Sequence, residues 1–142
     1  MELEYLIISK RDEEFCSDKT SFENLLSVDT SLNIDKEKHI ITDLSSGFNV
    51  KYKLEYYDND NRSERVFDLL LNTQNDDSSE EFSQIARKIR KIVIKINSEV
   101  TVCTIRNDIG RKKSILAYPI IFDVENLMRR LIYRFMYINV GM

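Results

Sequence analysis

The clearest alternation of hydrophobic and polar positions lies between residues 48 and 57. Five hydrophobic residues occupy every second position there: Phe48, Val50, Tyr52, Leu54 and Tyr56. This is the period of a strand with one buried face. Residues 39–44 and 64–72 are also apolar and are bounded by turn-forming sequences such as Ser45-Ser46-Gly47. The three segments predict an antiparallel meander in the middle of the chain.

A helical period runs through residues 79–97. Hydrophobic residues recur at spacings of three and four: Phe82, Ile85, Ala86, Ile89, Ile92, Val93 and Ile96. Ser78 and Glu81 have the spacing of a capping box, in which each side chain bonds the other residue's backbone N–H. Acidic residues lead and lysines follow, an order that suits the helix dipole. The pattern predicts an amphipathic helix.

Shorter patterns fill the remaining segments. Residues 3–9 and 99–106 are rich in β-branched residues and predict two more strands. Thr20 or Ser21 could cap a short helix that ends at Leu26. We expect residues 29–38 to be irregular. Residues 107–113 contain Gly110 and several basic side chains, and we expect a turn there.

The last element predicted is a long apolar helix that starts near Pro119, because proline suits the first turn of a helix. Its apolar side is wide, and ten residues form it: Ile120, Ile121, Val124, Leu127, Met128, Leu131, Ile132, Phe135, Met136 and Ile138. A single sheet face would not cover so wide a stripe. We therefore expect a second subunit, or a downstream domain of a longer protein, to cover six of these residues: Leu127, Met128, Leu131, Ile132, Phe135 and Met136.

Together these elements predict an α+β fold in the order β-α-β-β-β-α-β-α. The sheet would be mostly antiparallel, with about five strands and with helices packed on it. We expect an α+β domain over residues 1–117. The apolar helix of residues 118–142 would pack on that domain or on a partner.

The net charge of −3 conceals a strong asymmetry along the chain. Residues 1–83 contain 9 Lys and Arg against 20 Asp and Glu, whereas residues 84–142 contain 12 against 4. One interpretation is that the two halves attract each other, within the fold or across a homodimer. The other is a basic face that binds RNA or DNA. Seven residues would form such a face: Arg87, Lys88, Arg90, Lys91, Arg111, Lys112 and Lys113.

Motifs for catalysis and for cofactor binding are absent from the sequence. The three glycines form no phosphate-binding loop, and no G-x-S-x-G elbow occurs. His39 is the only histidine, and neither Cys16 nor Cys103 has the spacing of metal ligands. We therefore expect no catalytic residues, no metal and no cofactor. Two cysteines without disulfide spacing, and no apolar run of membrane-spanning length, favour a cytoplasmic protein that does not enter a membrane.

The run Tyr118-Pro-Ile-Ile-Phe-Asp-Val-Glu-Asn-Leu-Met-Arg-Arg-Leu-Ile resembles the opening helix of HEPN-type domains in prokaryotic abortive-infection and toxin proteins. An acidic residue, a leucine and an arginine recur in that helix, and Glu125, Leu127 and Arg129 match them. The family's ribonuclease signature, an arginine followed four to six residues later by histidine, does not occur here. The resemblance implies an N-terminal module of a defence or toxin protein, with any catalytic helices after residue 142.

These observations favour a non-catalytic interaction or regulatory module that self-associates through its last helix. The alternative is a nucleic-acid-binding domain that uses the basic face of residues 87–113.

Overall fold

The structure is a computed structural model that describes residues 1–12 and 15–140. It divides into two compact units, Met1–Ile109 and Gly110–Met142. The first unit is an α+β fold, as the hydrophobic pattern predicted. Its elements in chain order are β1 (Glu2–Lys10), α1 (Lys19–Leu26), β2 (Leu32–Asp35), β3 (Ile40–Asp43), β4 (Phe48–Asn59), β5 (Glu64–Asn72), α2 (Ser79–Ile96) and β6 (Thr101–Asn107). The helix α3 (Asp108–Val140) begins in its last two residues.

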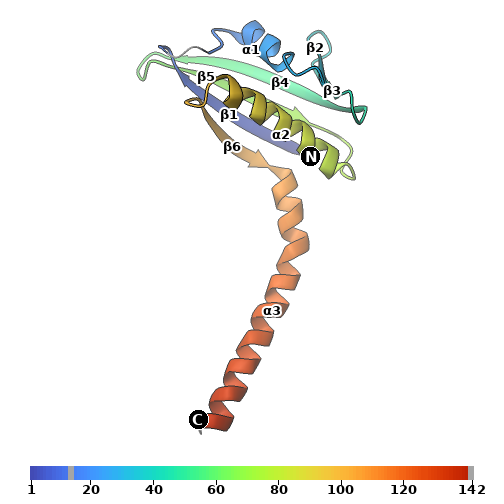
Figure 1. Cartoon of the computed structure of the whole chain (residues 1–142), viewed down its shortest axis with the longest axis vertical. Coiled ribbons are helices and arrows are strands. Elements are labelled where there is room, and N and C mark those ends of the chain that lie inside the picture. The colour runs from blue at the N-terminus through green and yellow to red at the C-terminus, as the bar shows by residue number, and fades with distance from the viewer. Residues whose placement is uncertain (13–14, 141–142) are drawn as a thin grey trace. The chain divides into compact units, whose positions relative to one another are not determined.

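The strands form one antiparallel sheet in the order β2-β3-β4-β5-β1-β6. Strands β2 to β5 follow one another as a meander, which the sequence predicted for β3, β4 and β5. Strand β1 then pairs with β5 on one side and with β6 on the other. The first strand of the chain therefore lies inside the sheet (Figure 1).

Helices α1 and α2 pack on the same face of this sheet (Figure 1). Tyr52 of β4 donates its hydroxyl hydrogen to Glu23 of α1 at 2.5 Å, and Tyr5 of β1 donates to the carbonyl of Ala86 in α2 at 3.2 Å. The alternation predicted for β4 is confirmed, because Val50, Tyr52 and Leu54 are buried. Burial of alternate residues in β1 and β5 places the hydrophobic core between the sheet and the two helices.

Helix α2 buries its predicted face from Phe82 to Val93, but Ile96 at its C-terminal end is 48% exposed, and its capping box is not formed. Phe82, Ile85 and Ile89 are completely buried against the sheet. Ser78 is the N-cap residue, yet its side chain makes no capping hydrogen bond. In α1 the cap is Asp18, whose carboxylate accepts a hydrogen bond from the backbone N–H of Ser21 at 2.7 Å. The expectation that Thr20 or Ser21 caps this helix was therefore wrong.

Two further sequence-based expectations need correction. Residues 29–38 contain strand β2, which pairs with β3, so the sheet has six strands and not five. The expected turn over 107–113 is helical, because α3 begins at Asp108 and Pro119 lies inside it. Asp108 favours this start, since it places an acidic residue in the first turn and its carboxylate accepts the N–H of Glu2 at 2.9 Å.

The hairpin between β3 and β4 turns at Gly47, whose φ of +72° suits a residue without a Cβ. Strands β4 and β5 meet at a longer polar turn, and Arg11 after β1 forms ion pairs with Asp58 and Asp60 beside it. Among residues 1–12 and 15–140, no helix is both long enough and apolar enough to cross a membrane.

Candidate interaction surfaces

The second unit presents the apolar stripe predicted for the C-terminal helix. Nine of its ten residues are exposed by 51–76%, and only Met136 is half-buried. The six predicted interface residues, Leu127, Met128, Leu131, Ile132, Phe135 and Met136, all lie in the last two-thirds of α3. Exposed aliphatic side chains are ordinary when scattered, but nine along a single helix are not.

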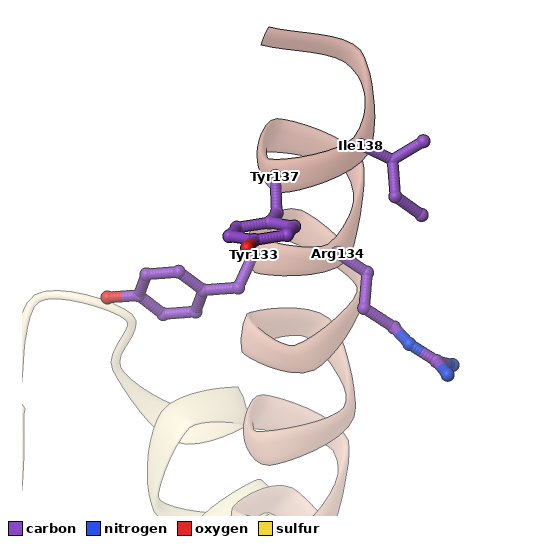
Figure 2. Close-up of a pocket in the computed structure, with 4 residues that line it drawn as sticks. All are labelled: Tyr133, Arg134, Tyr137 and Ile138. Carbon is purple, nitrogen blue, oxygen red and sulfur yellow. The ribbon is translucent and has the colours of Figure 1, made fainter. Parts of the chain in front are cut away.

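Charged side chains border the stripe, while the opposite side of α3 exposes Phe122, Tyr133 and Tyr137. At 100° per residue, Asp123, Arg130 and Arg134 lie along one edge of the stripe, and Glu125 and Arg129 lie along the opposite edge. Glu125 and Arg129 form an ion pair at 2.5 Å, one helical turn apart. Figure 2 shows the C-terminal end of α3, where the rings of Tyr133 and Tyr137 project together, away from Arg134 and Ile138. All four line a shallow hollow that belongs to this helix alone.

A second surface lies on the outer side of α2, opposite its buried face. Arg87, Arg90 and Lys91, three of the predicted nucleic-acid-binding residues, are exposed there together with Lys95. None of these four cations forms an ion pair with a residue of the described ranges 1–12 and 15–140. They surround the side chain of Ile94, which is 40% exposed.

These cations repel one another at short range along the helix. Arg87 and Lys91 are four residues apart, as are Lys91 and Lys95, and like charges at this spacing destabilise a helix by a few tenths of a kcal/mol per pair. An ordinary solvated helix face intersperses acidic residues among the basic ones. The outer side of α2 does so only in its first turn, at Glu80.

Lys88 differs from the other basic residues of α2 because it reaches back to the sheet. Its Nζ lies 3.0 Å from Oδ1 of Asp43 at the end of β3. Burial raises the pKa of Asp43, but hydrogen bonds from Ser45 and Lys88 outweigh burial and lower that pKa below its ordinary value. Lys88 thus compensates a buried charge.

The three remaining predicted nucleic-acid-binding residues lie in the second unit. Arg111 and Lys113 are exposed in the first turns of α3, and Lys112 is half-buried there. The fold therefore brings Arg87, Arg90 and Lys91 together along α2, whereas Arg111, Lys112 and Lys113 follow one another in the first turns of α3.

The sheet face opposite the helices carries neighbouring carboxyl groups. Glu4 of β1 and Asp68 of β5 are diagonal neighbours in this ladder. A hydrogen bond with Asp68, then partial burial and the negative charge of Asp68, raise the pKa of Glu4. No group of three or more His, Cys, Asp or Glu in the described part of the chain has the arrangement of a metal site.

Cys16 is buried beside α1, and Cys103 is half-buried on β6. Burial raises the pKa of the Cys16 thiol to about 11. A thiol of that pKa carries almost no thiolate at neutral pH and is a poor nucleophile.

The sequence-based reasoning missed the contact between Asp43 and Lys88, which are 45 residues apart. One signal was present: Asp43 follows Ile41 by two residues, so it lies on the same inward-facing side of β3. A buried carboxylate needs a hydrogen-bond or ion-pair partner, and the lysines and arginines of the predicted helix 79–97 could supply a cation.

Neither a protein-family model, nor a curated protein, nor a solved structure matches this chain.

Proposed function

We propose that this chain is a non-catalytic interaction module that self-associates through α3. The observation that carries the proposal is the exposed stripe of nine apolar side chains between Ile120 and Ile138. Water contact with such a stripe is unfavourable, and a helix partner would cover its central residues. Association through α3 would then bring two copies of the unit Met1–Ile109 into one dimer.

The stripe is large enough for a weak pair with a Kd in the micromolar range. Burying an apolar side chain of this size removes at least about 60 Å² from water, since each contributes roughly 1.5 kcal/mol at about 25 cal/mol per Å². Complete burial of nine such side chains on each of two chains would give about 1,100 Å². This upper value lies just below the roughly 1,200–2,000 Å² of stable specific interfaces and suits a weak pair.

A place in a prokaryotic defence or toxin protein is part of the same proposal. Its support is the resemblance of residues 118–132 to the opening helix of HEPN-type domains, through Glu125, Leu127 and Arg129. In that setting the module would pair two copies of a protein whose activity resides in another segment.

Sedimentation tests self-association directly. The wild-type chain should form dimers at concentrations from about 1 to 100 μM, which bracket a micromolar Kd. Leu131→Asp places a charge in the stripe and should leave a monomer. Tyr133→Asp adds the same charge two residues away, on the opposite side of α3, and should leave the dimer intact.

Circular dichroism of both variants controls for loss of the fold, because the sheet and α2 do not involve these positions. A wild-type chain that stays monomeric at about 100 μM, two orders of magnitude above a micromolar Kd, would overturn the proposal. An equal effect of Leu131→Asp and Tyr133→Asp would show that the stripe is not the contact surface.

The second candidate function is nucleic-acid binding through α2. The specific observation that favours it is the set of four cations, Arg87, Arg90, Lys91 and Lys95, that repel one another and have no ion-pair partner in the described chain. A polyanion would relieve this repulsion, and phosphate contacts from lysine and arginine are independent of sequence.

A further inference from the structure

The charges beside the stripe have an order along α3. Asp123 and Glu125 precede the middle of the stripe, and Arg129, Arg130 and Arg134 follow it. Beside the stripe, the acidic residues therefore come before the basic ones on both edges, while Arg111, Lys112 and Lys113 lie in the first turns of α3, before the stripe. A second copy of the helix in reversed direction would place Arg129, Arg130 and Arg134 beside Asp123 and Glu125 of the first.

From this order we propose that two copies of α3 pair antiparallel, with the two-fold axis between Leu127 and Met128. The inference rests on the proposed self-association and adds the orientation and register of the partner. A two-fold axis at this point relates position 127 of one copy to position 128 of the other, and every other position by the same rule.

The apolar side chains support this register. With this axis, Leu127 faces Met128 of the second copy, and Val124 faces Leu131. Further out, Ile120 faces Phe135, and at the ends Ala117 faces Ile138. Each layer thus joins two apolar residues, and the smaller partner in three of them meets a larger one, an arrangement that fills space evenly. No layer places a charged side chain at the centre of the contact.

The edges of the stripe support the same register. In an antiparallel pair, each edge of one helix meets the same edge of the other helix. Asp123 then lies midway in height between Arg130 and Arg134 of the second copy. On the opposite edge, Glu125 lies within one residue in height of Arg129 of the second copy. The two-fold axis forms each of these contacts twice.

A parallel pair would arrange the same charges unfavourably. Identical residues of the two copies would lie at the same height, so that six arginine side chains would gather within about one and a half helical turns, roughly 8 Å. Concentrating charges of one sign in an interface disfavours that arrangement, and helix pairs use such charges to select their orientation.

Disulfide trapping distinguishes the two orientations. Ala117→Cys and Ile138→Cys are each placed in a chain that also carries Cys16→Ala and Cys103→Ala, and the two variants are mixed and oxidised. The antiparallel register should give the crosslink between positions 117 and 138. It should give none between two copies of Ala117→Cys. In this register the second copy's position 117 lies opposite position 138 of the first copy, 21 residues or about 31 Å along the helix from the first copy's position 117, and a disulfide needs Cα atoms within about 7 Å.

Charge exchange provides an independent measurement. Asp123→Arg should weaken the dimer by about tenfold, because it places arginine beside two arginines on each side of the two-fold axis. Mixing this variant with Arg130→Asp/Arg134→Asp should give a heterodimer tighter than either homodimer. Circular dichroism of each variant shows that α3 remains helical.

The outcomes separate this inference from the proposed function. A crosslink between two copies of Ala117→Cys, in a sample that sediments as a dimer, would overturn the antiparallel arrangement and leave self-association standing. A dimer that forms neither crosslink would overturn the register. A monomer in sedimentation would overturn both proposals.

Discussion

Nζ of Lys88 lies 3.0 Å from Oδ1 of Asp43, whose side chain is completely buried, while the lysine side chain is 27% exposed. The contact joins α2 to the end of β3, across 45 residues of the chain. Asp43 also accepts the hydroxyl hydrogen of Ser45 at 2.6 Å, and its second oxygen, Oδ2, has no hydrogen-bond partner in the described structure. Among residues 1–12 and 15–140, Lys88 is therefore the one cation that pairs with this buried carboxylate.

We predict that Lys88→Ala lowers the free energy of unfolding by about 1–3 kcal/mol at pH 7, because it leaves a buried carboxylate with one partner fewer. Lys91→Ala, on the exposed side of the same helix, should change it by less than about 0.5 kcal/mol. Urea denaturation followed by circular dichroism measures both. Equal losses would contradict the structural role of Lys88.

The pair of Asp43 and Lys88 should also make the free energy of unfolding depend on pH. The folded-state pKa of Asp43 lies below the ordinary 3.8, so the stability from this group is present above pH 3.8 and is lost as the pH falls through its folded-state pKa. In the Lys88→Ala variant the pKa of Asp43 should rise, because the hydrogen bond and the positive charge of Lys88 no longer lower it. The stability difference between wild type and variant should therefore shrink as the pH falls through the variant's pKa and vanish below the wild-type pKa, which itself lies below 3.8.

Ionised Glu4 should destabilise the folded state, whereas ionised Asp43 stabilises it. Its folded-state pKa is raised above 4.5 by Asp68 and by burial, so its ionisation at neutral pH opposes folding. We predict that Glu4→Gln raises the free energy of unfolding at pH 7 by roughly 0.2–1 kcal/mol, the usual cost of like charges on neighbouring strands. The gain should vanish as the pH falls to about 4, where the wild-type carboxyl is itself protonated.

Glu37→Gln provides the control for Glu4→Gln. Glu37 is exposed in the turn between β2 and β3, so removing its charge should change stability by less than about 0.5 kcal/mol at either pH. A gain at pH 7 that persists unchanged at low pH would show that repulsion from Asp68 is not its cause.

Nucleic-acid binding through α2 should depend steeply on salt. Affinity for single- and double-stranded probes should fall linearly with the logarithm of salt concentration, with a slope near −0.9 per phosphate neutralised on B-DNA. Arg87→Glu/Arg90→Glu/Lys91→Glu should abolish binding in fluorescence anisotropy. Lys38→Glu/Lys51→Glu reverses exposed lysines elsewhere in the same unit and should retain most of it. Affinity that survives the triple reversal would exclude this surface.

Local patterns predicted most of the fold. The alternation from Phe48 to Tyr56 and the helical period from Phe82 to Val93 each give a buried face directly, because hydrophobic side chains must leave water on one side. The strand at 64–72 was predicted with its exact bounds. These elements are long, and their patterns repeat several times, so a single exception does not obscure them.

Other features depend on contacts that no local pattern records. Strand β2 has only four residues, two of them polar, and it is a strand because β3 pairs with it. The start of α3 was missed because glycine and proline usually mark the ends of helices, whereas α3 continues through both Gly110 and Pro119. The basic residues of α2 were predicted to form one face, yet Lys88 forms an ion pair with Asp43. This ion pair follows from the tertiary packing of α2 on the sheet.

The position of β1 also constrains how the chain can fold. Glu2 pairs with Asn72, and Ile7 pairs with both Phe67 and Val102, so strand β1 is completed by residues that are made much later. The meander from β2 to β5 can form early through short hairpins, whereas the insertion of β1 requires the closure of a loop of more than 50 residues. Until β6 is synthesised, the outer edge of β1 carries unpaired N–H and C=O groups. The nascent chain is therefore most vulnerable to strand pairing with other chains between the synthesis of Asn72 and that of Asn107.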